Sequence, residues 1–171
     1  KVPFLREKKI SDDKTGTEKV IREFLKKIEN SKIKNVFCIY PASPLLKSQD
    51  LKKAYKIFIK KKLDYLVSIA KFQSNPERSL IIKKNTLKFK YPKNAKKNSQ
   101  DFEYQYYDTG NFYIYSKKFL LDRRRKKIKK GFYILEQIRA LDINNIEDFE
   151  NAKKIFKLVK NENWIKTYKF K

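Results

Sequence analysis

The stretch Val36-Phe37-Cys38-Ile39-Tyr40-Pro41-Ala42-Ser43-Pro44 decides the fold. A continuous apolar run that ends at a proline predicts a strand buried on both faces, followed by a loop. From about Ser48 the apolar residues repeat at helical spacing, and a second buried run follows at Tyr65 to Ala70. Strand, helix and strand in this order indicate an α/β fold in which helices cover a largely parallel sheet.

Weaker patterns on both sides of this region predict further elements. The apolar spacing after the polar turn 11–17 predicts a helix over 18–28, for which Thr17 is a suitable N-cap. Asn145 is a suitable cap for a helix that begins at about Ile146. The remaining expectations are a hairpin formed by 80–82 and 87–89, a polar excursion over 90–105, a strand over 111–115 and a helical turn over 117–122.

Length and composition place the chain among small globular proteins. The 171 residues, 40% of them hydrophobic, can build one sizeable core, so we expect a single domain or part of one. The apolar runs are too short to cross a bilayer and the N-terminus does not resemble a secretory signal, so we expect a cytoplasmic protein without a membrane partner. The single cysteine, Cys38, lies within the first apolar run and is interpreted as a structural thiol.

The net charge of +25 raises the alternative of a nucleic-acid-binding module. Only 7 of the 44 basic residues are arginine, the residue that bidentate recognition of phosphate and guanine favours. The dense charge run 123–130 is more typical of a solvated turn than of a binding site. We therefore expect no specific nucleic-acid partner, and keep this run, with nearby Tyr and Phe, as the less favoured alternative.

The absence of histidine restricts the chemistry that the chain can perform. Mechanisms must use carboxylates, hydroxyls, Lys or Arg, or a metal held by oxygen ligands. Asp142 and Asn144 alternate just before a predicted helix, so their side chains would point the same way and could hold Mg²⁺ against a triphosphate. The alternative is that these two residues simply begin a turn.

The segment Tyr107-Asp108-Thr109-Gly110-Asn111-Phe112-Tyr113 is the second candidate for chemistry. Its glycine would allow a close approach of backbone to ligand, and its aromatic residues could pack on a sugar ring. It could equally be an ordinary turn that leads into a strand.

Taken together and in order, these motifs carry a resemblance to a known family. The chain resembles the pseudaminic acid cytidylyltransferases, relatives of the N-acylneuraminate cytidylyltransferases, over nearly its whole length. The residues that carry it are Val2-Pro3-Phe4-Leu5-Arg6, Ile10-Ser11-Asp12-Asp13, Thr15-Gly16-Thr17, Val20-Ile21, Ile39-Tyr40-Pro41-Ala42-Ser43-Pro44-Leu45, Arg78 near Leu80, Ser99-Gln100-Asp101, Tyr107 to Tyr113, and Asp142-Ile143-Asn144 with Glu147-Asp148.

The resemblance implies a Rossmann-like nucleotide-diphospho-sugar transferase fold with a mostly parallel sheet. It also implies that CMP is transferred from CTP to an acidic nine-carbon sugar, of the pseudaminic or sialic acid type, with release of pyrophosphate. Mg²⁺ is the implied cofactor, and a homodimer, built through the 90–105 excursion, is the implied assembly. We expect Arg6, Thr17 and Asp142 to meet around one CTP and its magnesium.

The resemblance also assigns roles to individual residues. The implied nucleotide-binding residues are Arg6, Thr17 and Ser43. The implied substrate-binding residues are Tyr40, Gln100, Gly110 and Tyr113. Asp142 is the implied catalytic residue and, with Asn144, the implied metal ligand.

Three departures from the family pattern bear on activity. The chain opens at Lys1 without the family's first strand, its triphosphate-holding loop and its Ser-Thr-Asp segment, so 1–171 would be the C-terminal two-thirds to three-quarters of one cytidylyltransferase domain. Asn144 replaces a second aspartate, and Asn98 replaces an arginine before Ser-Gln-Asp. We therefore expect that 1–171 alone is poorly soluble or molten and does not bind CTP measurably. A degenerate relative that serves as a binding or assembly partner is the alternative.

Overall fold

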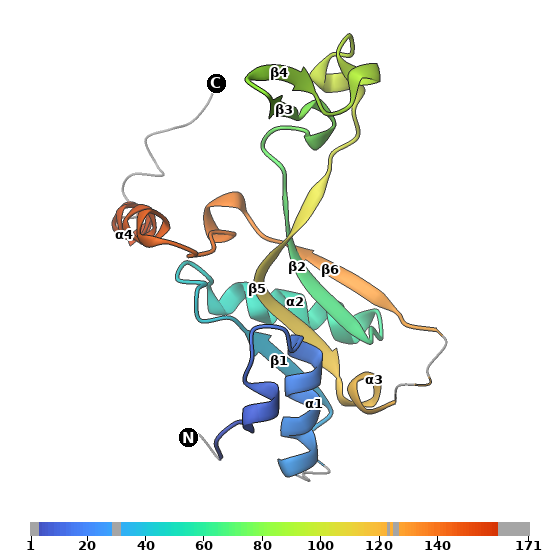
Figure 1. Cartoon of the computed structure of the whole chain (residues 1–171). Coiled ribbons are helices and arrows are strands. Elements are labelled where there is room, and N and C mark those ends of the chain that lie inside the picture. Colours follow the sequence, from blue (N-terminus) through green and yellow to red (C-terminus); the bar gives the residue numbers. More distant parts are fainter. Residues whose placement is uncertain (1–3, 29–31, 123, 125–126, 161–171) are drawn as a thin grey trace. The chain divides into compact units, whose positions relative to one another are not determined.

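The computed structural model describes residues 4–28, 32–122, 124 and 127–160 (Figure 1). Val2 and Pro3 of the family pattern, and Arg123, Arg125 and Lys126 of the charge run, lie outside the described residues. The chain divides into two compact units. The first unit comprises 1–40, 48–67 and 112–132, and the second comprises 41–47, 68–111 and 133–171. Each unit is described by itself.

Helices and strands alternate along most of the chain. The helices are α1 (Thr17–Ile28), α2 (Ser48–Lys60), α3 (Lys117–Leu121) and α4 (Ile146–Lys160). The strands are β1 (Asn35–Ile39), β2 (Tyr65–Lys71), β3 (Leu80–Lys83), β4 (Thr86–Phe89), β5 (Tyr106–Ser116) and β6 (Lys130–Ile134). Short 3₁₀ turns lie at Lys8–Ile10, Pro76–Arg78, Pro92–Asn94, Ser99–Asp101 and Gln137–Arg139.

Four strands form the main sheet in the order β1-β5-β2-β6, and β3 and β4 form a separate hairpin. The α/β class is confirmed, but the sheet is mixed instead of mostly parallel, because β5 pairs antiparallel with β1 from Asn35↔Ser116 to Ile39↔Phe112. The cause is the segment 72–105 that follows β2 and contains both the β3–β4 hairpin and the excursion 90–105. Its two ends meet where the Phe72 N–H donates to the Gln105 carbonyl at 2.9 Å, so β5 re-enters the sheet at the end where β2 leaves it.

The two faces of β1 pack against different helices of the first unit. Val36 and Cys38 contact a core cluster built from α1, α3 and β5. The intervening Phe37 packs on Tyr55 of α2, with ring centroids 5.4 Å apart. The expectation of a strand buried on both faces is nevertheless wrong, because Phe37 and Ile39 remain 38% and 49% exposed, so the face of β1 that meets α2 is only partly covered.

The core cluster of the first unit fixes α1 and α3 against one face of the sheet. Its buried members are Ile21, Leu25, Tyr115 and Leu120. The helices α1 and α3 lie side by side (Figure 1), and the Arg22 Nε donates to the Leu120 carbonyl at 2.7 Å. Each fully buried aliphatic side chain contributes about 1.5–3 kcal/mol, so this cluster is a main source of the unit's stability.

Local sequence signals predicted several elements well. The expected hairpin is present, with a turn at Lys84 and Asn85, whose φ values of 47° and 61° suit a type I′ turn. The expected cap of α4 is present, because the Asn145 Oδ1 accepts the Asp148 N–H at 2.9 Å. Thr17 is not a cap, however: it is the first residue of α1, and its hydroxyl bonds Tyr40 instead.

Candidate functional site

In the first unit, three of the predicted site residues lie together. The Thr17 hydroxyl, at the start of α1, makes a short hydrogen bond to the Tyr40 hydroxyl, just beyond the end of β1. The Tyr40 ring stands edge-on to Tyr113 of β5, with centroids 5.8 Å apart. A helix start, a strand end and the neighbouring strand thus bring together two hydroxyls and an aromatic surface, a combination suited to ribose or sugar hydroxyls.

The polar turn before α1 is held by one carboxylate. Asp12 accepts hydrogen bonds from the Lys14 N–H at 2.7 Å, the Thr15 N–H at 2.6 Å and the Thr15 hydroxyl at 3.0 Å. The Lys14 N–H is the main cause that lowers the pKa of Asp12 below its ordinary value. Asp12 therefore fixes the path of the chain into Thr17.

Arg6 precedes this turn and is exposed. Its Nε donates to the Ser11 hydroxyl at 3.1 Å. It borders a small, mostly apolar pocket of about 140 Å³, in which the rings of Phe4 and Phe24 lie 5.4 Å apart. No hydrogen bond from its terminal nitrogens is found among residues 4–28, 32–122, 124 and 127–160, so they can reach a ligand carbonyl.

A group of stacked aromatic rings holds the side chain of Tyr113 in place. Tyr65 stacks on Tyr113 at 6.1 Å and on Tyr115 at 5.2 Å, and Phe119 stacks on Tyr115 at 6.3 Å. Burial raises the pKa of Tyr115 and, on the neighbouring strand, the pKa of the half-buried Cys38 thiol. A thiol held in its neutral form is a poor nucleophile, which fits the structural role expected for Cys38.

In the second unit, one asparagine links the remaining loop residues. The Ser43 hydroxyl donates to the Asn111 carbonyl at 3.3 Å, and the Asn111 Nδ2 donates to the Leu141 carbonyl at 3.3 Å. Gly110, just before Asn111, has a φ of +66°, and its N–H is accepted by Asp108 Oδ1 at 3.0 Å. Ser43, Gly110 and Asp142 are therefore brought to adjoining segments.

Asp142 and Asn144 lie in an exposed loop that α4 anchors. The Asn144 Nδ2 donates to Asp142 Oδ2 at 3.3 Å, and Asp148 Oδ2 accepts the N–H groups of Asn144 and Asn145 at 2.9 and 3.2 Å. The donor set is carboxylate and amide oxygen, which suits Mg²⁺. Across the described ranges no three His, Cys, Asp or Glu residues gather as a metal cage. An ion at Asp142 would therefore take further ligands from phosphates and water.

Asp142 also borders a pocket of the second unit. This pocket has a volume of about 650 Å³, and it is lined by Phe72, Gln73, Ser74, Tyr107, Gln137, Ala140, Leu141 and Asp142. The rings of Phe72 and Tyr107 lie 5.0 Å apart. The aspartate thus faces a space large enough for part of a nucleotide or a sugar.

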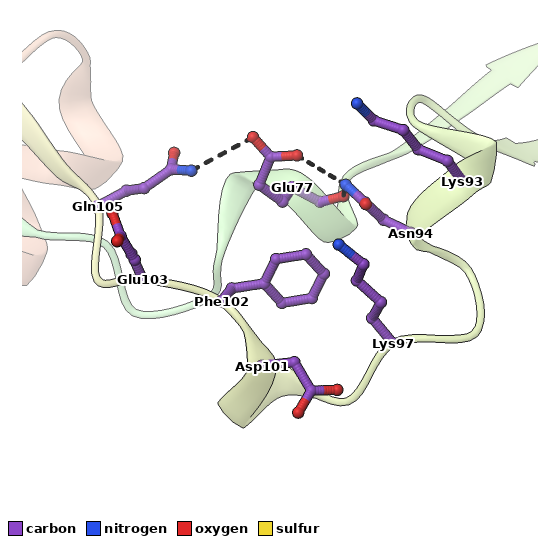
Figure 2. A pocket seen from close by; sticks show the side chains of 8 residues that line it. All are labelled: Glu77, Lys93, Asn94, Lys97, Asp101, Phe102, Glu103 and Gln105. Carbon is purple, nitrogen blue, oxygen red and sulfur yellow. Dashed lines mark hydrogen bonds between the residues drawn. The ribbon is translucent and has the colours of Figure 1, made fainter.

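Gln100 lies apart from these groups, in the excursion. It is exposed in the 3₁₀ turn Ser99–Asp101, where Asn98 and Asp101 form a capping box. The adjacent pocket of about 320 Å³ is lined by Asp101 and Lys97 but not by Gln100 (Figure 2).

The carboxylate in the centre of this excursion pocket is already engaged. Glu77 accepts the Asn94 Nδ2 at 2.6 Å and the Gln105 Nε2 at 3.4 Å (Figure 2). These bonds join Glu77, which precedes the hairpin, to Asn94 and to Gln105, the last residue of the excursion. The network thus shapes the excursion, and its bonded carboxylate is not a free ligand-binding group.

Two residues of the site carried no predicted role. Asn111 and Asp148 both lie within the motifs that the sequence highlighted, yet a side chain that supports a loop gives no signal of its own. The roles predicted for Arg6, Thr17, Tyr40, Ser43, Gln100, Gly110, Tyr113, Asp142 and Asn144 remain predictions.

Comparison with known proteins places this geometry in a chemical context. A family model described as cytidylyltransferase matches residues 3–165. A pseudaminic acid cytidylyltransferase of Campylobacter jejuni subsp. jejuni serotype O:2 is 30% identical over 162 residues, which cover 92% of this chain and 70% of the relative. That of serotype O:23/36 is 29% identical over the same shares.

A third relative joins two activities in one chain. It is the pseudaminic acid cytidylyltransferase and UDP-2,4-diacetamido-2,4,6-trideoxy-beta-L-altropyranose hydrolase of Helicobacter pylori. It is 28% identical over 111 residues, which cover 64% of this chain and 21% of the relative.

Proposed function

Because this chain belongs to the cytidylyltransferase family, we propose that its substrates are CTP and an acidic nine-carbon sugar of the pseudaminic acid type. Because members of this family are cytidylyltransferases, the chain is a CTP-dependent nucleotidyltransferase. Support for the sugar comes from the two Campylobacter relatives, both named for pseudaminic acid. Sialic acid is the competing acceptor that an assay must include.

The observation that carries the proposal is the arrangement around Asn111. Ser43 and the Asp142 loop are both hydrogen-bonded to it, and Asp142 borders a pocket of about 650 Å³. A hydroxyl proposed to bind nucleotide is thus linked through one residue to the loop of a carboxylate proposed to bind metal, and that carboxylate borders a space that admits a substrate. Within the first unit, where the Thr17 and Tyr40 hydroxyls bond each other, we assign Thr17 to the nucleotide and Tyr40 to the sugar.

The proposed reaction is a displacement at the α-phosphorus of CTP. The sugar's anomeric hydroxyl gives up its proton to water as its oxygen forms the new P–O bond, the bond to the bridging oxygen of the β-phosphate breaks, and pyrophosphate leaves. Bound Mg²⁺ would neutralise the triphosphate and the departing pyrophosphate. Asp142 and Asn144 would hold that ion, Arg6 is assigned to the cytosine, and Gln100, Gly110 and Tyr113 are assigned to the sugar. We place this CTP-consuming reaction in the cytoplasm.

We also propose a homodimer that forms through the β3–β4 hairpin and the excursion that follows it. The hairpin, drawn in green in Figure 1, exposes Ile82 by 78% and Leu87 by 63%, and Leu80 and Ile81 are exposed as well. Apolar side chains on both faces of a two-stranded hairpin are costly in water, and a second copy would cover them. No helix in the described ranges is long and apolar enough to span a membrane.

Asp142→Asn is the decisive variant. Protein expressed from the complete reading frame is assayed for pyrophosphate release with CTP, Mg²⁺ and either pseudaminic acid or N-acetylneuraminic acid. We expect turnover with pseudaminic acid, and a fall of roughly 100-fold or more in Asp142→Asn, because one charge that holds the metal is lost.

The matched control is Glu150→Gln, which removes an exposed carboxylate of α4 that pairs with Lys153 at 2.9 Å. This control should keep wild-type activity. Wild-type turnover by Asp142→Asn would overturn the role of Asp142. If neither sugar is turned over and calorimetry detects no CTP binding, the proposed enzymatic function is wrong. The chain would then be a non-catalytic relative.

A further inference from the structure

Asn111 is a polar side chain in a position where the fold would accept an apolar one. It is fully buried, and in the sequence it precedes the equally buried Phe112 of the same strand. Amides are costly to remove from water unless both their donor and their acceptor find partners. The function of this amide therefore needs a specific account.

Only half of the amide is used within the described ranges. The Nδ2 donates to the Leu141 carbonyl at 3.3 Å, whereas Oδ1 is buried and no described group donates to it. A buried acceptor without a donor lowers the stability of the folded state. A leucine of similar size would not bury an unpaired acceptor. The asparagine at this position therefore lowers the stability of the folded chain.

The bond that Asn111 does make leads directly to the loop of the proposed metal ligand. Leu141 precedes Asp142, and on the other side the carbonyl of Asn111 accepts the Ser43 hydroxyl at 3.3 Å. Gly110, in the left-handed region at φ +66°, turns the strand just before this point. One residue therefore sets the spacing between the Ser43 loop and the Asp142 loop.

We propose that Asn111 is a positioning residue, whose Nδ2 holds the Leu141 carbonyl and thereby aims the Asp142 carboxylate. The inference rests on the proposed function, since Asp142 is a metal ligand only there. Asn111 acts on the ion through the backbone and does not contact it. Loss of a group that orients a metal ligand typically weakens metal binding by about 10–100-fold.

The test is Asn111→Leu, read out by metal binding without turnover. Mn²⁺ alone is titrated into ¹⁵N-labelled protein, and paramagnetic broadening of the amide signals around Asp142 gives an apparent Kd. We expect this Kd to rise roughly 10–100-fold in Asn111→Leu. The melting temperature should stay close to that of the wild type, because leucine removes the unpaired Oδ1 but also takes the donor from the Leu141 carbonyl. The Mg²⁺ concentration for half-maximal turnover should rise by a similar factor.

Two further variants make the outcomes distinct. Asn94→Leu removes another buried amide of the second unit, whose Nδ2 donates to Glu77 Oε2 at 2.6 Å, and it should leave the Kd for Mn²⁺ unchanged. Asp142→Asn should abolish the broadening. If it does so while Asn111→Leu keeps the wild-type Kd, the positioning role is overturned. If Asp142→Asn changes nothing, it is the metal site of the proposed function that fails.

If Asn111→Leu does not fold, Asn111→Ser decides. Its shorter hydroxyl cannot reach the Leu141 carbonyl, so a folded Asn111→Ser protein should bind Mn²⁺ as weakly as expected for leucine. A wild-type Kd in Asn111→Ser would overturn the proposal.

Discussion

Gly110 illustrates how a residue can belong to a site for a backbone reason. The resemblance implied a close approach to substrate, and the space beside its Cα is open, with no heavy atom within 4 Å of an added Cβ. What the position demands is its φ of +66°, which a residue with a Cβ adopts only at a cost. The glycine is therefore needed for the turn of β5 before Asn111, whatever ligand it meets.

Gly110→Ala should lower the free energy of unfolding by about 1–2 kcal/mol, since alanine is strained in the left-handed region. Urea denaturation followed by circular dichroism measures this. Gly16→Ala is the matched control, because its added Cβ also meets open space and its φ lies outside the left-handed region. The control should be neutral or slightly stabilising, as alanine reduces the entropy of the unfolded chain. Equal effects in the two variants would contradict the backbone explanation.

At the scale of elements, periodicity predicted what depends on neighbours in sequence. The apolar run 36–40, the helix after Ser48 and the hairpin at 80–89 each follow from a local pattern, and each is present. The pairing of β5 with β1 has no such pattern, because it depends on where the excursion returns. β6 was missed, since it begins at Lys130 within a charge run and its side chains are mostly exposed.

The residues of the candidate site also divide into those that the local sequence predicts and those that depend on contacts between distant positions. Asp142, Asn144 and the 107–113 segment were recognisable because their residue types suit a ligand. The supporting residue Asn111 was not, because its bond to Leu141 joins positions that lie 30 residues apart along the chain. A contact of this kind becomes visible only once the loop has been placed.

The β3–β4 hairpin leads to a prediction about assembly. Ile82→Lys places a charge on the most exposed apolar side chain of the hairpin, at 78% exposure. If a second copy covers this side chain, the buried ammonium opposes association, and the dimer constant should weaken about tenfold or more. Sedimentation equilibrium measures it. Ile146→Lys, which alters a similarly exposed residue of α4, is the control and should leave the constant unchanged. If both variants have the same dimer constant as the wild type, the hairpin is not the interface.

For the whole molecule, the charge of +25 must act on any polyanion nearby. Lysine supplies most of it, and lysine binds phosphate as a point charge without reading bases. We therefore expect duplex DNA to be retained on filters at about 50 mM salt and released by about 200 mM, where counterion release no longer favours binding. Arg124→Gln with Lys127→Gln, in the charge run, should weaken retention no more than Lys52→Gln with Lys53→Gln on α2. A larger loss of DNA retention for the first pair, or retention above about 200 mM salt, would contradict the view that DNA binds only to charge spread over the surface. The charge run would then be a true nucleic-acid site, separate from the cytidylyltransferase chemistry.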